Sequence, residues 1–235
     1  MQEGQQALWR TNIAANLSSL RHKFLIYKGF IVGLRLRQFQ GEDVTVHSRL
    51  KSATADLNVE VESTLNLDEI TKSSAAYSKT LCILYCVFDH TYKELVDIDF
   101  QPLKIDLGSI GRRRDWLAAD LHALALPLPA PRSLGFELPT SGHGFGCLYV
   151  LEGSALGGRV ISKRVKQTLG LGPATGGAYF HGLGRQTARH WSDFLTALNT
   201  IPANSAMGAD AEAGAIATFV AFRQAISQFG DRCKT

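Results

Sequence analysis

The chain has 235 residues, of which 45% are hydrophobic and 20% charged. This composition supports a buried core and excludes wholesale disorder, a collagen-like repeat and a coiled-coil rod. The formal net charge of +4 is uneven, because residues 1–40 carry six basic residues against one acidic residue. We expect a basic extension over residues 1–42, one domain over residues 43–230 and a tail over residues 231–235. The body lacks a basic excess, which argues against nucleic-acid binding.

The cysteine content and the apolar runs restrict where the protein works. No CxxC pair occurs among the four cysteines, so we expect neither a disulfide framework nor a zinc site, and a reducing cytoplasm fits best. The apolar stretch over residues 24–34 is interrupted by Lys28 and is shorter than the roughly 20 residues of a membrane-spanning helix. We therefore expect a cytoplasmic protein without a transmembrane segment. The basic extension is either solvated or a contact for an acidic partner or a membrane.

Helical spacing dominates from residue 46 onward. The first stripe predicts one helix, with Asp43 as a candidate N-cap, and its apolar residues recur every third or fourth position: Val46, Leu50, Ala53, Leu57 and Val61. A second helix is predicted over residues 73–97, opened by Ser73 or Ser74. A third runs over residues 112–124, where the three arginines 112–114 are expected to form a solvated face, and a proline-rich loop follows it.

The second half of the chain continues in the same way. A long apolar stretch over residues 144–171 is interrupted by glycines, and a glycine-rich loop leads from it to a helix over residues 191–198. The last helix is predicted to begin at Asp210. Period-2 alternation is brief, so the expected fold class is all-α, a single domain of several helices.

The glycines inside the 144–171 stretch call for an explanation. Gly153, Gly157 and Gly158 each cost about 1 kcal/mol relative to alanine in a helix, which a sequence tolerates where the backbone bends or comes close to something. Gly153 and Gly157 leave one helix face without side chains. Either a flat ligand lies against that backbone, or another helix packs closely there.

Three segments carry a resemblance to a known family. The run from Gly146 to Gly158, GCLYVLEGSALGG, resembles the distal-helix signature of bacterial heme oxygenases. The turn YFHGLG at residues 179–184, followed by Trp191 and Phe194, and the run from Leu50 to Glu62 resemble the same family in order and spacing. The resemblance covers about residues 46–229. It implies a helical bundle in which a kinked glycine-rich helix covers one face of heme.

The resemblance also implies a reaction and its participants. The family cleaves heme oxidatively to biliverdin with release of iron and CO, heme b being both substrate and cofactor, and takes electrons from a ferredoxin or a reductase. Gly153, Gly157 and Gly158 would approach the iron-bound oxygen and Ser154 would hold water, because a serine hydroxyl is no acid near pH 7. Lys51 would pair with a propionate. Thr54 belongs to the same binding motif, and Arg185 and Arg189 are candidates for the other propionate.

One position departs from the family pattern. Asn58 stands where the family has its axial histidine, and an asparagine amide oxygen is a poor ligand for heme iron. On one continuous helix His47 would lie about 16 Å away, too far to substitute. His143 is a candidate distal ligand or proton-network member. The alternative function is therefore an impaired heme oxygenase-like protein that binds heme, a bilin or a protein partner without turnover. A different reaction in a related helical pocket is a third reading.

Overall fold

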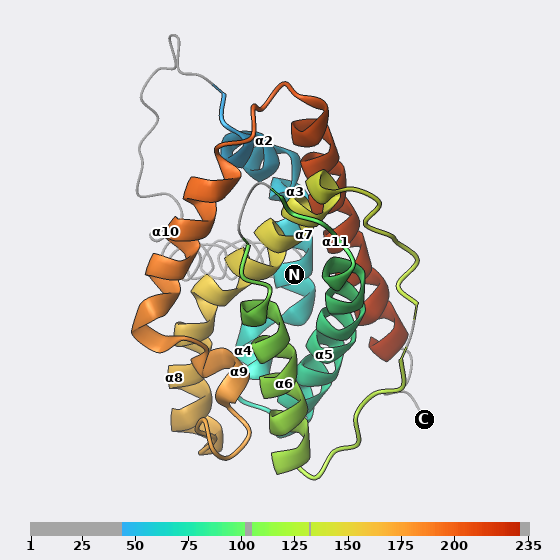
Figure 1. Cartoon of the computed structure of the whole chain (residues 1–235). Helices are drawn as coiled ribbons and strands as arrows, with labels where there is room; N and C mark the ends of the chain where they lie inside the picture. Colours follow the sequence, from blue (N-terminus) through green and yellow to red (C-terminus); the bar gives the residue numbers. More distant parts are fainter. Residues whose placement is uncertain (1–43, 102–104, 132, 231–235) are drawn as a thin grey trace, which may run out of the picture. The chain divides into compact units, whose positions relative to one another are not determined.

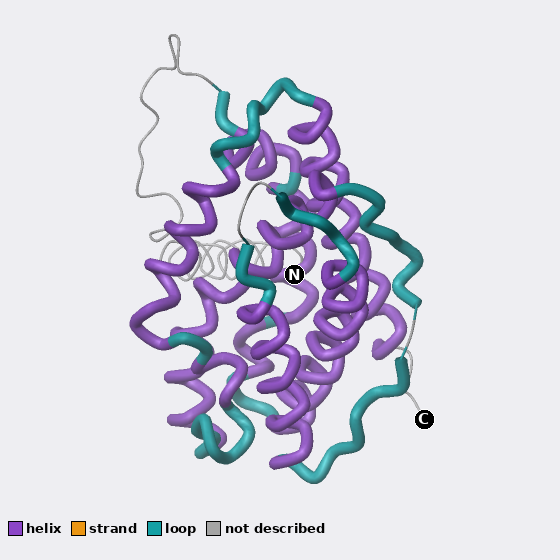
Figure 2. Tube along the Cα trace, viewed as in Figure 1, coloured by secondary structure: helices purple, strands orange, loops and turns teal. Residues whose placement is uncertain are grey.

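The structure is a computed structural model that describes residues 44–101, 105–131 and 133–230. The basic extension, its Asp43 and the tail over residues 231–235 lie outside the described residues, so the predicted division of the chain stays a prediction. Within the described ranges, Figure 2 shows helices joined by loops, and the one extended pairing is an isolated bridge between Thr45 and Pro202. The predicted all-α class is confirmed.

Most predicted helices are present, with bounds that the structure now fixes. The helical elements are, in chain order, α2 (Val46–Ala53), α3 (Ala55–Leu65), α4 (Leu67–Ile70), α5 (Ser74–Val96), α6 (Gly108–Ala123), α7 (Ser141–Ser154), the 3₁₀ turn η1 (Ala155–Gly157), α8 (Gly158–Leu169), α9 (Ala178–His181), the 3₁₀ turn η2 (Gly184–Gln186), α10 (Thr187–Leu198) and α11 (Ala206–Gly230). Ser73 caps α5 as predicted, since its hydroxyl accepts a hydrogen bond from the Ala76 N–H at 3.3 Å.

The prediction of one continuous helix over residues 46–61 is wrong, because the chain breaks at Thr54. The Thr54 hydroxyl donates to the Leu50 carbonyl at 2.8 Å. Threonine back-bonding of this kind often bends helices, although α5 stays continuous through the same bond at Thr80. The backbone of Thr54 leaves the helical region at φ −107° and ψ 3°. The N-cap of α2 is Thr45, whose hydroxyl accepts from the Ser48 N–H at 3.1 Å. The break turns α3 relative to α2 at the motif that carries Asn58.

Two helices begin earlier than predicted, and in each a polar side chain just upstream accepts a hydrogen bond from a backbone N–H of the first turn. Asp106 accepts a hydrogen bond from the Gly108 N–H at 2.8 Å, so α6 begins four residues before Arg112. The Ser205 hydroxyl accepts from the Gly208 N–H at 3.1 Å, so α11 begins at Ala206 and not at Asp210. Short caps of this kind lie outside the apolar stripe from which the helices were predicted.

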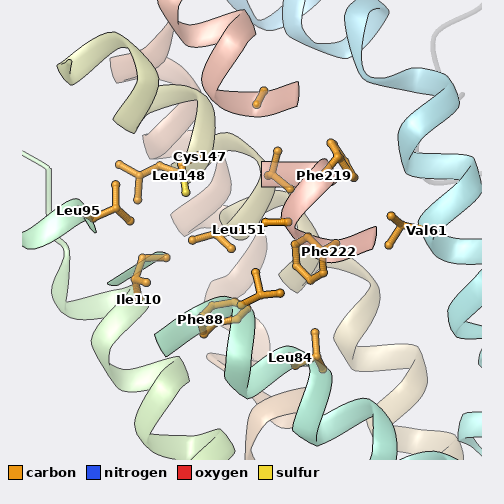
Figure 3. Close-up of a cluster of buried hydrophobic side chains, with 14 of the residues drawn as sticks. Val61, Leu84, Phe88, Leu95, Ile110, Cys147, Leu148, Leu151, Phe219 and Phe222 are labelled. Atoms are coloured by element: carbon orange, nitrogen blue, oxygen red, sulfur yellow. The ribbon is translucent and has the colours of Figure 1, made fainter. Parts of the chain in front are cut away.

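Helix α7 is the central helix of the fold (Figure 1). Buried residues lie on all its sides, in contrast to the one-sided stripe of α8. In Figure 3, Cys147, Leu148 and Leu151 of α7 point into a core that Phe219 and Phe222 of α11 share. Side chains from α3, α5 and α6 complete this cluster, among them Val61, Leu84, Phe88 and Ile110.

Glycines bring α7 and α11 into backbone contact. A Cβ on Gly146 would overlap the Ala211 carbonyl and approach the Ala215 nitrogen to 2.5 Å. A Cβ on Gly214 of α11 would in turn overlap the His143 carbonyl. Small residues on both helices therefore set the distance between the two axes. None of the described helices is long and apolar enough to span a bilayer.

Candidate functional site

The glycine-rich stretch bends as its sequence predicts. The 3₁₀ turn Ala155–Gly157 interrupts the helix between α7 and α8, at the three glycines that were expected to cause it. At Gly158 a Cβ would come within 2.9 Å of the Phe180 carbonyl, so this glycine allows α8 to pack on α9. At Gly153 a Cβ would meet the Trp191 ring at 3.5 Å, an ordinary contact distance. The two glycines therefore face different neighbours.

Helix α3 is tied to the α7–α8 segment at both of its ends. At its start, Thr54 lies beside the Tyr149 phenol of α7 and offsets part of the rise that burial gives to the pKa of Tyr149. Beyond its end, Asp68 of α4 pairs with Arg164 of α8 at 3.3 Å, and the Thr168 hydroxyl donates to the Thr71 carbonyl. Asn58 and Glu62 lie between these ties, as do Gly153 and the bend on the other side. We define Thr54, Asn58, Glu62, Tyr149, Gly153 and Trp191 as the candidate site.

Asn58 and Glu62 form a polar pair on α3. Both are half-buried, and the Asn58 amide nitrogen donates to the Glu62 carboxylate at 3.0 Å. Burial raises the pKa of Glu62, and the hydrogen bond from Asn58 offsets only part of that rise. The amide nitrogen of Asn58 is thus committed along the helix, and the amide oxygen is the atom that remains for a ligand.

Aromatic side chains gather where α2, α7 and α10 meet. The Trp191 ring lies 5.8 Å from the Tyr149 ring, 6.2 Å from the His47 ring and 5.7 Å from the Phe194 ring, measured between centroids. Burial, with the charge of Lys51 added, lowers the pKa of His47 and keeps its imidazole neutral near pH 7. Lys51 itself is exposed in the last turn of α2, where its ammonium is free to meet an anion.

A buried ion pair lies directly beside Gly153. Arg113 of α6 and Glu152 of α7, each 4% exposed, form a salt bridge, and Arg113 also donates to the Leu151 carbonyl at 2.7 Å. Ser109 donates to Glu152 at 2.6 Å, and the His190 Nε2 lies 3.2 Å from the same carboxylate. Glu152 therefore joins α6, α7 and α10 at one point.

The pKa values of this network follow from its contacts. Burial alone would raise the pKa of Glu152, but the hydrogen bond from His190, the charge of Arg113 and the hydrogen bond from Ser109 outweigh burial and hold that pKa below its usual range. The same hydrogen bond to Glu152 raises the pKa of His190 against its own partial burial. Glu152 is therefore ionised near neutral pH, and His190 keeps its proton to a higher pH than a free histidine.

Arg113 corrects one prediction from the sequence. The three arginines 112–114 were expected to form a solvated face, which is wrong for Arg113, although Arg112 is exposed and Arg114 lies over the Tyr92 ring at 4.5 Å. A signal was present, because Arg113 falls three residues after Ile110 and four before Leu117, in the apolar stripe of α6. The network that Arg113 forms could not be read from that spacing.

Ser154 lies at the bend beside a small cavity. Its hydroxyl donates to the Leu151 carbonyl at 2.7 Å, and Ser154 lies beside the Tyr179 phenol, where it offsets part of the rise that burial gives to the pKa of Tyr179. The cavity measures about 20 Å³ and is lined by Ser154, Tyr179, Arg113 and Thr187, among others. That volume admits a single water molecule with several polar partners. The arrangement can hold a water at the bend, the role predicted for Ser154.

The structure does not bring every predicted residue to this place. His143 lies at the beginning of α7, where its Nδ1 is 2.8 Å from the Thr140 hydroxyl, and that hydroxyl donates to Asp210 at 2.8 Å. Arg185 is exposed, and the Arg189 guanidinium is 3.8 Å from Asp193 on its own helix. Among the described residues, no group of three or more histidine, cysteine or acidic side chains could hold a metal ion.

Asp120 positions α9 and with it the Tyr179 wall of the cavity. Its two carboxylate oxygens accept from the N–H groups of Ala178 and Tyr179 at 2.7 and 2.8 Å. We expect Asp120→Ala to lower the free energy of unfolding by about 2 to 3 kcal/mol, because two part-buried N–H groups lose their acceptor. Urea denaturation measures this change. Asp115→Ala, an exposed change on the same helix, is the control, and an equal loss in both variants would contradict the assignment.

The fold and site define the class of protein as an all-helical bundle with a glycine-interrupted central helix and a polar network beside the bend. A family model described as heme oxygenase matches residues 139–228. The chain is 34% identical over 119 residues to a heme oxygenase of Xanthomonas campestris pv. campestris (strain 8004), which covers 49% of this chain and 68% of that protein. The chain belongs to the heme oxygenase family.

Two solved structures share the fold. The NO- and CO-bound heme oxygenase of Neisseria meningitidis superposes with a TM-score of 0.68 at 23% identity, over 80% of this chain and 93% of that one. The heme oxygenase of Leptospira interrogans superposes with a TM-score of 0.64 at 17% identity, over 79% of this chain and 100% of that one. At these identities the likeness extends to the fold alone.

Proposed function

We propose that this chain binds heme or a closely related tetrapyrrole between α3 and the bend of α7, without a strong protein ligand to the iron. Membership of the heme oxygenase family supports the ligand class. The observation that carries the proposal is the Asn58–Glu62 pair, an amide hydrogen-bonded to a carboxylate where the family pattern has an imidazole. The role assigned to Gly153, a bare backbone for a flat ring, is part of this proposal.

The residues present fit the periphery of such a ligand better than its iron. Lys51 is exposed one turn before Thr54 and offers a cation to a propionate. The amide oxygen of Asn58 is a hard, weak donor, whereas heme iron is held in proteins by histidine, cysteine, methionine or tyrosine. Binding would therefore depend on apolar contact and on propionate pairing. Arg185 and Arg189 stay candidates for the second propionate, and both are exposed.

A second candidate function is the oxidative cleavage of heme to biliverdin, iron and CO, with electrons from a ferredoxin or reductase. Bound heme would supply the oxygen chemistry. The observation that favours this candidate is the set of polar groups next to the bend. Ser154 and Tyr179 line a water-sized cavity there. Glu152 is hydrogen-bonded to Ser109 and His190. These groups could hold and pass protons beside the bend of α7.

A hemin titration decides between the candidates. We expect wild type to bind hemin with a broad Soret band and to leave it intact when ascorbate and catalase are added. Asn58→His is expected to bind at least about tenfold more tightly with a sharp Soret band, since loss of even an outer-shell partner costs a metal site this much. Val59→His, on an exposed position of the same helix, is the matched control.

Each outcome of the titration has a distinct meaning. Formation of a biliverdin spectrum by wild type would establish the second candidate and reject binding without turnover. Equal binding by all three proteins would reject the role given to position 58. Absence of hemin binding by wild type and by Asn58→His would reject the proposed function.

A further inference from the structure

The Trp191 side chain covers the face of α7 at Gly153. The bare α-carbon of Gly153 faces the six-membered edge of the indole, which a Cβ would meet at 3.5 Å and 3.7 Å. Tyr149, one turn earlier on α7, contacts the same indole with its ring and lies beside Thr54. A flat macrocycle and the indole cannot both lie on this one face of α7.

The neighbour of Trp191 in sequence fixes α10 to the core. His190 lies 3.2 Å from the Glu152 carboxylate, which is itself 4% exposed and adjacent to Gly153. The other groups that face His190 are Arg113 and Ser109 of α6 and Asp106 from the segment before α6. Trp191 therefore covers Gly153, and the preceding residue, His190, binds α10 to Glu152.

The chain before α10 is a glycine-containing turn. Gly182 and Gly184 both have positive φ, 53° and 56°, on either side of Leu183, and the 3₁₀ turn η2 follows. Glycines absorb changes of φ and ψ at little cost, which suits residues that let a rigid helix swing. Trp191 and His190 lie in the first half of α10 and contact α7, whereas Phe194 and Leu198 further along α10 are buried in the core, so the movement concerns the end of α10 next to the glycines.

We propose that α10 is the movable wall of the tetrapyrrole site: Trp191 seals Gly153 in the empty protein, and the His190–Glu152 ion pair holds it closed. The proposal rests on the proposed function for the identity of the ligand. Entry of the ligand requires the indole to leave Gly153, and with it the His190–Glu152 contact to loosen. The wall opens more readily once His190 loses its proton, because the charge that attracts Glu152 is then gone.

Stopped-flow mixing with hemin tests the wall. We expect Trp191→Ala to associate about tenfold faster than wild type, since aromatic contacts of this kind are worth roughly a factor of ten together. Trp191→Phe should lie between the two, and it keeps an aromatic ring should the alanine variant fail to fold. The wild-type rate should rise with pH above 6.5, the ordinary pKa of histidine. His190→Gln should be fast and independent of pH, whereas His122→Gln, at an exposed position of α6, should follow wild type.

A second experiment tests the same proposal without any ligand. The chain has three tryptophans, so in a Trp9→Phe, Trp116→Phe background the fluorescence comes from Trp191 alone. We expect acrylamide to quench Trp191 more strongly as the pH rises above 6.5 and equally strongly at all pH values in His190→Gln.

The two experiments separate the wall from the proposed function. Equal association rates in wild type and Trp191→Ala would overturn the proposal that Trp191 closes the site. Weaker binding by the variant would overturn it as well, because Trp191 would then be a contact for the ligand. If no variant binds hemin, the proposed function fails. The quenching experiment still tests whether the His190–Glu152 ion pair holds α10 closed. If the quenching of Trp191 changes neither with pH nor in His190→Gln, the role given to the His190–Glu152 pair is overturned.

Discussion

Gly146→Leu is expected to leave the chain without its native fold. Any Cβ at this position overlaps the Ala211 carbonyl of α11, and the obstacle is backbone that cannot rotate away. Helices α7 and α11 would have to separate, and we expect a loss of about 3 kcal/mol or more in the free energy of unfolding, enough to unfold a domain of ordinary stability. Far-UV circular dichroism and a urea melt of the purified variant measure this loss.

Gly153→Ala is the matched control for that experiment. It lies on the same helix, but its Cβ would meet only the Trp191 ring, at 3.5 Å. Alanine is also the better helix former by about 1 kcal/mol, so the control should be as stable as wild type or more stable. A folded Gly146→Leu would show that α7 and α11 can move apart, and a loss at Gly153 equal to that at Gly146 would mean that the glycine helix is merely fragile.

Arg113→Met is expected to lower the free energy of unfolding by about 3 to 5 kcal/mol, since it leaves one partner of a buried ion pair without its counter-charge. Arg113 and Glu152 are each 4% exposed, and Ser109 and His190 alone would then solvate the carboxylate. Arg112→Met, whose guanidinium is half exposed and 3.4 Å from Asp106, should stay within about 0.5 kcal/mol of wild type. Urea midpoints of the three proteins measure the difference.

The pH dependence of the same network gives a second check. The folded pKa of Glu152 is lowered, so its contribution is present above the unfolded value of 4.5 and is lost as the pH falls through the folded pKa. The folded pKa of His190 is raised, so its contribution is present below 6.5 and is lost as the pH rises through the folded pKa. His190→Gln should abolish the alkaline loss alone. A wild-type stability that is flat from pH 6 to 9 would contradict the His190–Glu152 assignment.

The helices could be predicted because their apolar residues repeat at helical spacing, and the bend could be predicted from Gly153, Gly157 and Gly158. The break at Thr54 could not, since the apolar stripe runs unchanged across it and the Thr54 hydroxyl bonds Leu50 in the way that Thr80 and Thr91 bond within the unbroken α5. The start of α11 was missed for a related reason. The cap at Ser205 lies outside any pattern of hydrophobic residues.

The site was predicted in part. Asn58, Thr54 and Gly153 were found by resemblance to a motif, and the structure ties their helices together through Tyr149. The sequence does not predict the contacts of Arg113 and His190, because nothing local shows that Glu152, about 40 residues from each, meets both. Contacts between residues so far apart in sequence depend on how the helices cross, which periodicity does not encode.

The contacts of α2 have a consequence for the order in which the molecule can be made. Arg49 pairs with Glu212 across 163 residues of sequence and also donates to the Ala203 carbonyl at 2.5 Å. A ribosome delivers α2 and α3 long before it delivers α11, on which both helices and α7 depend. Helices α2 and α3, the second of which carries Asn58, therefore wait through most of synthesis with their apolar stripe uncovered until α11 emerges. A chaperone that binds exposed apolar segments would therefore meet α2 and α3 before they are covered.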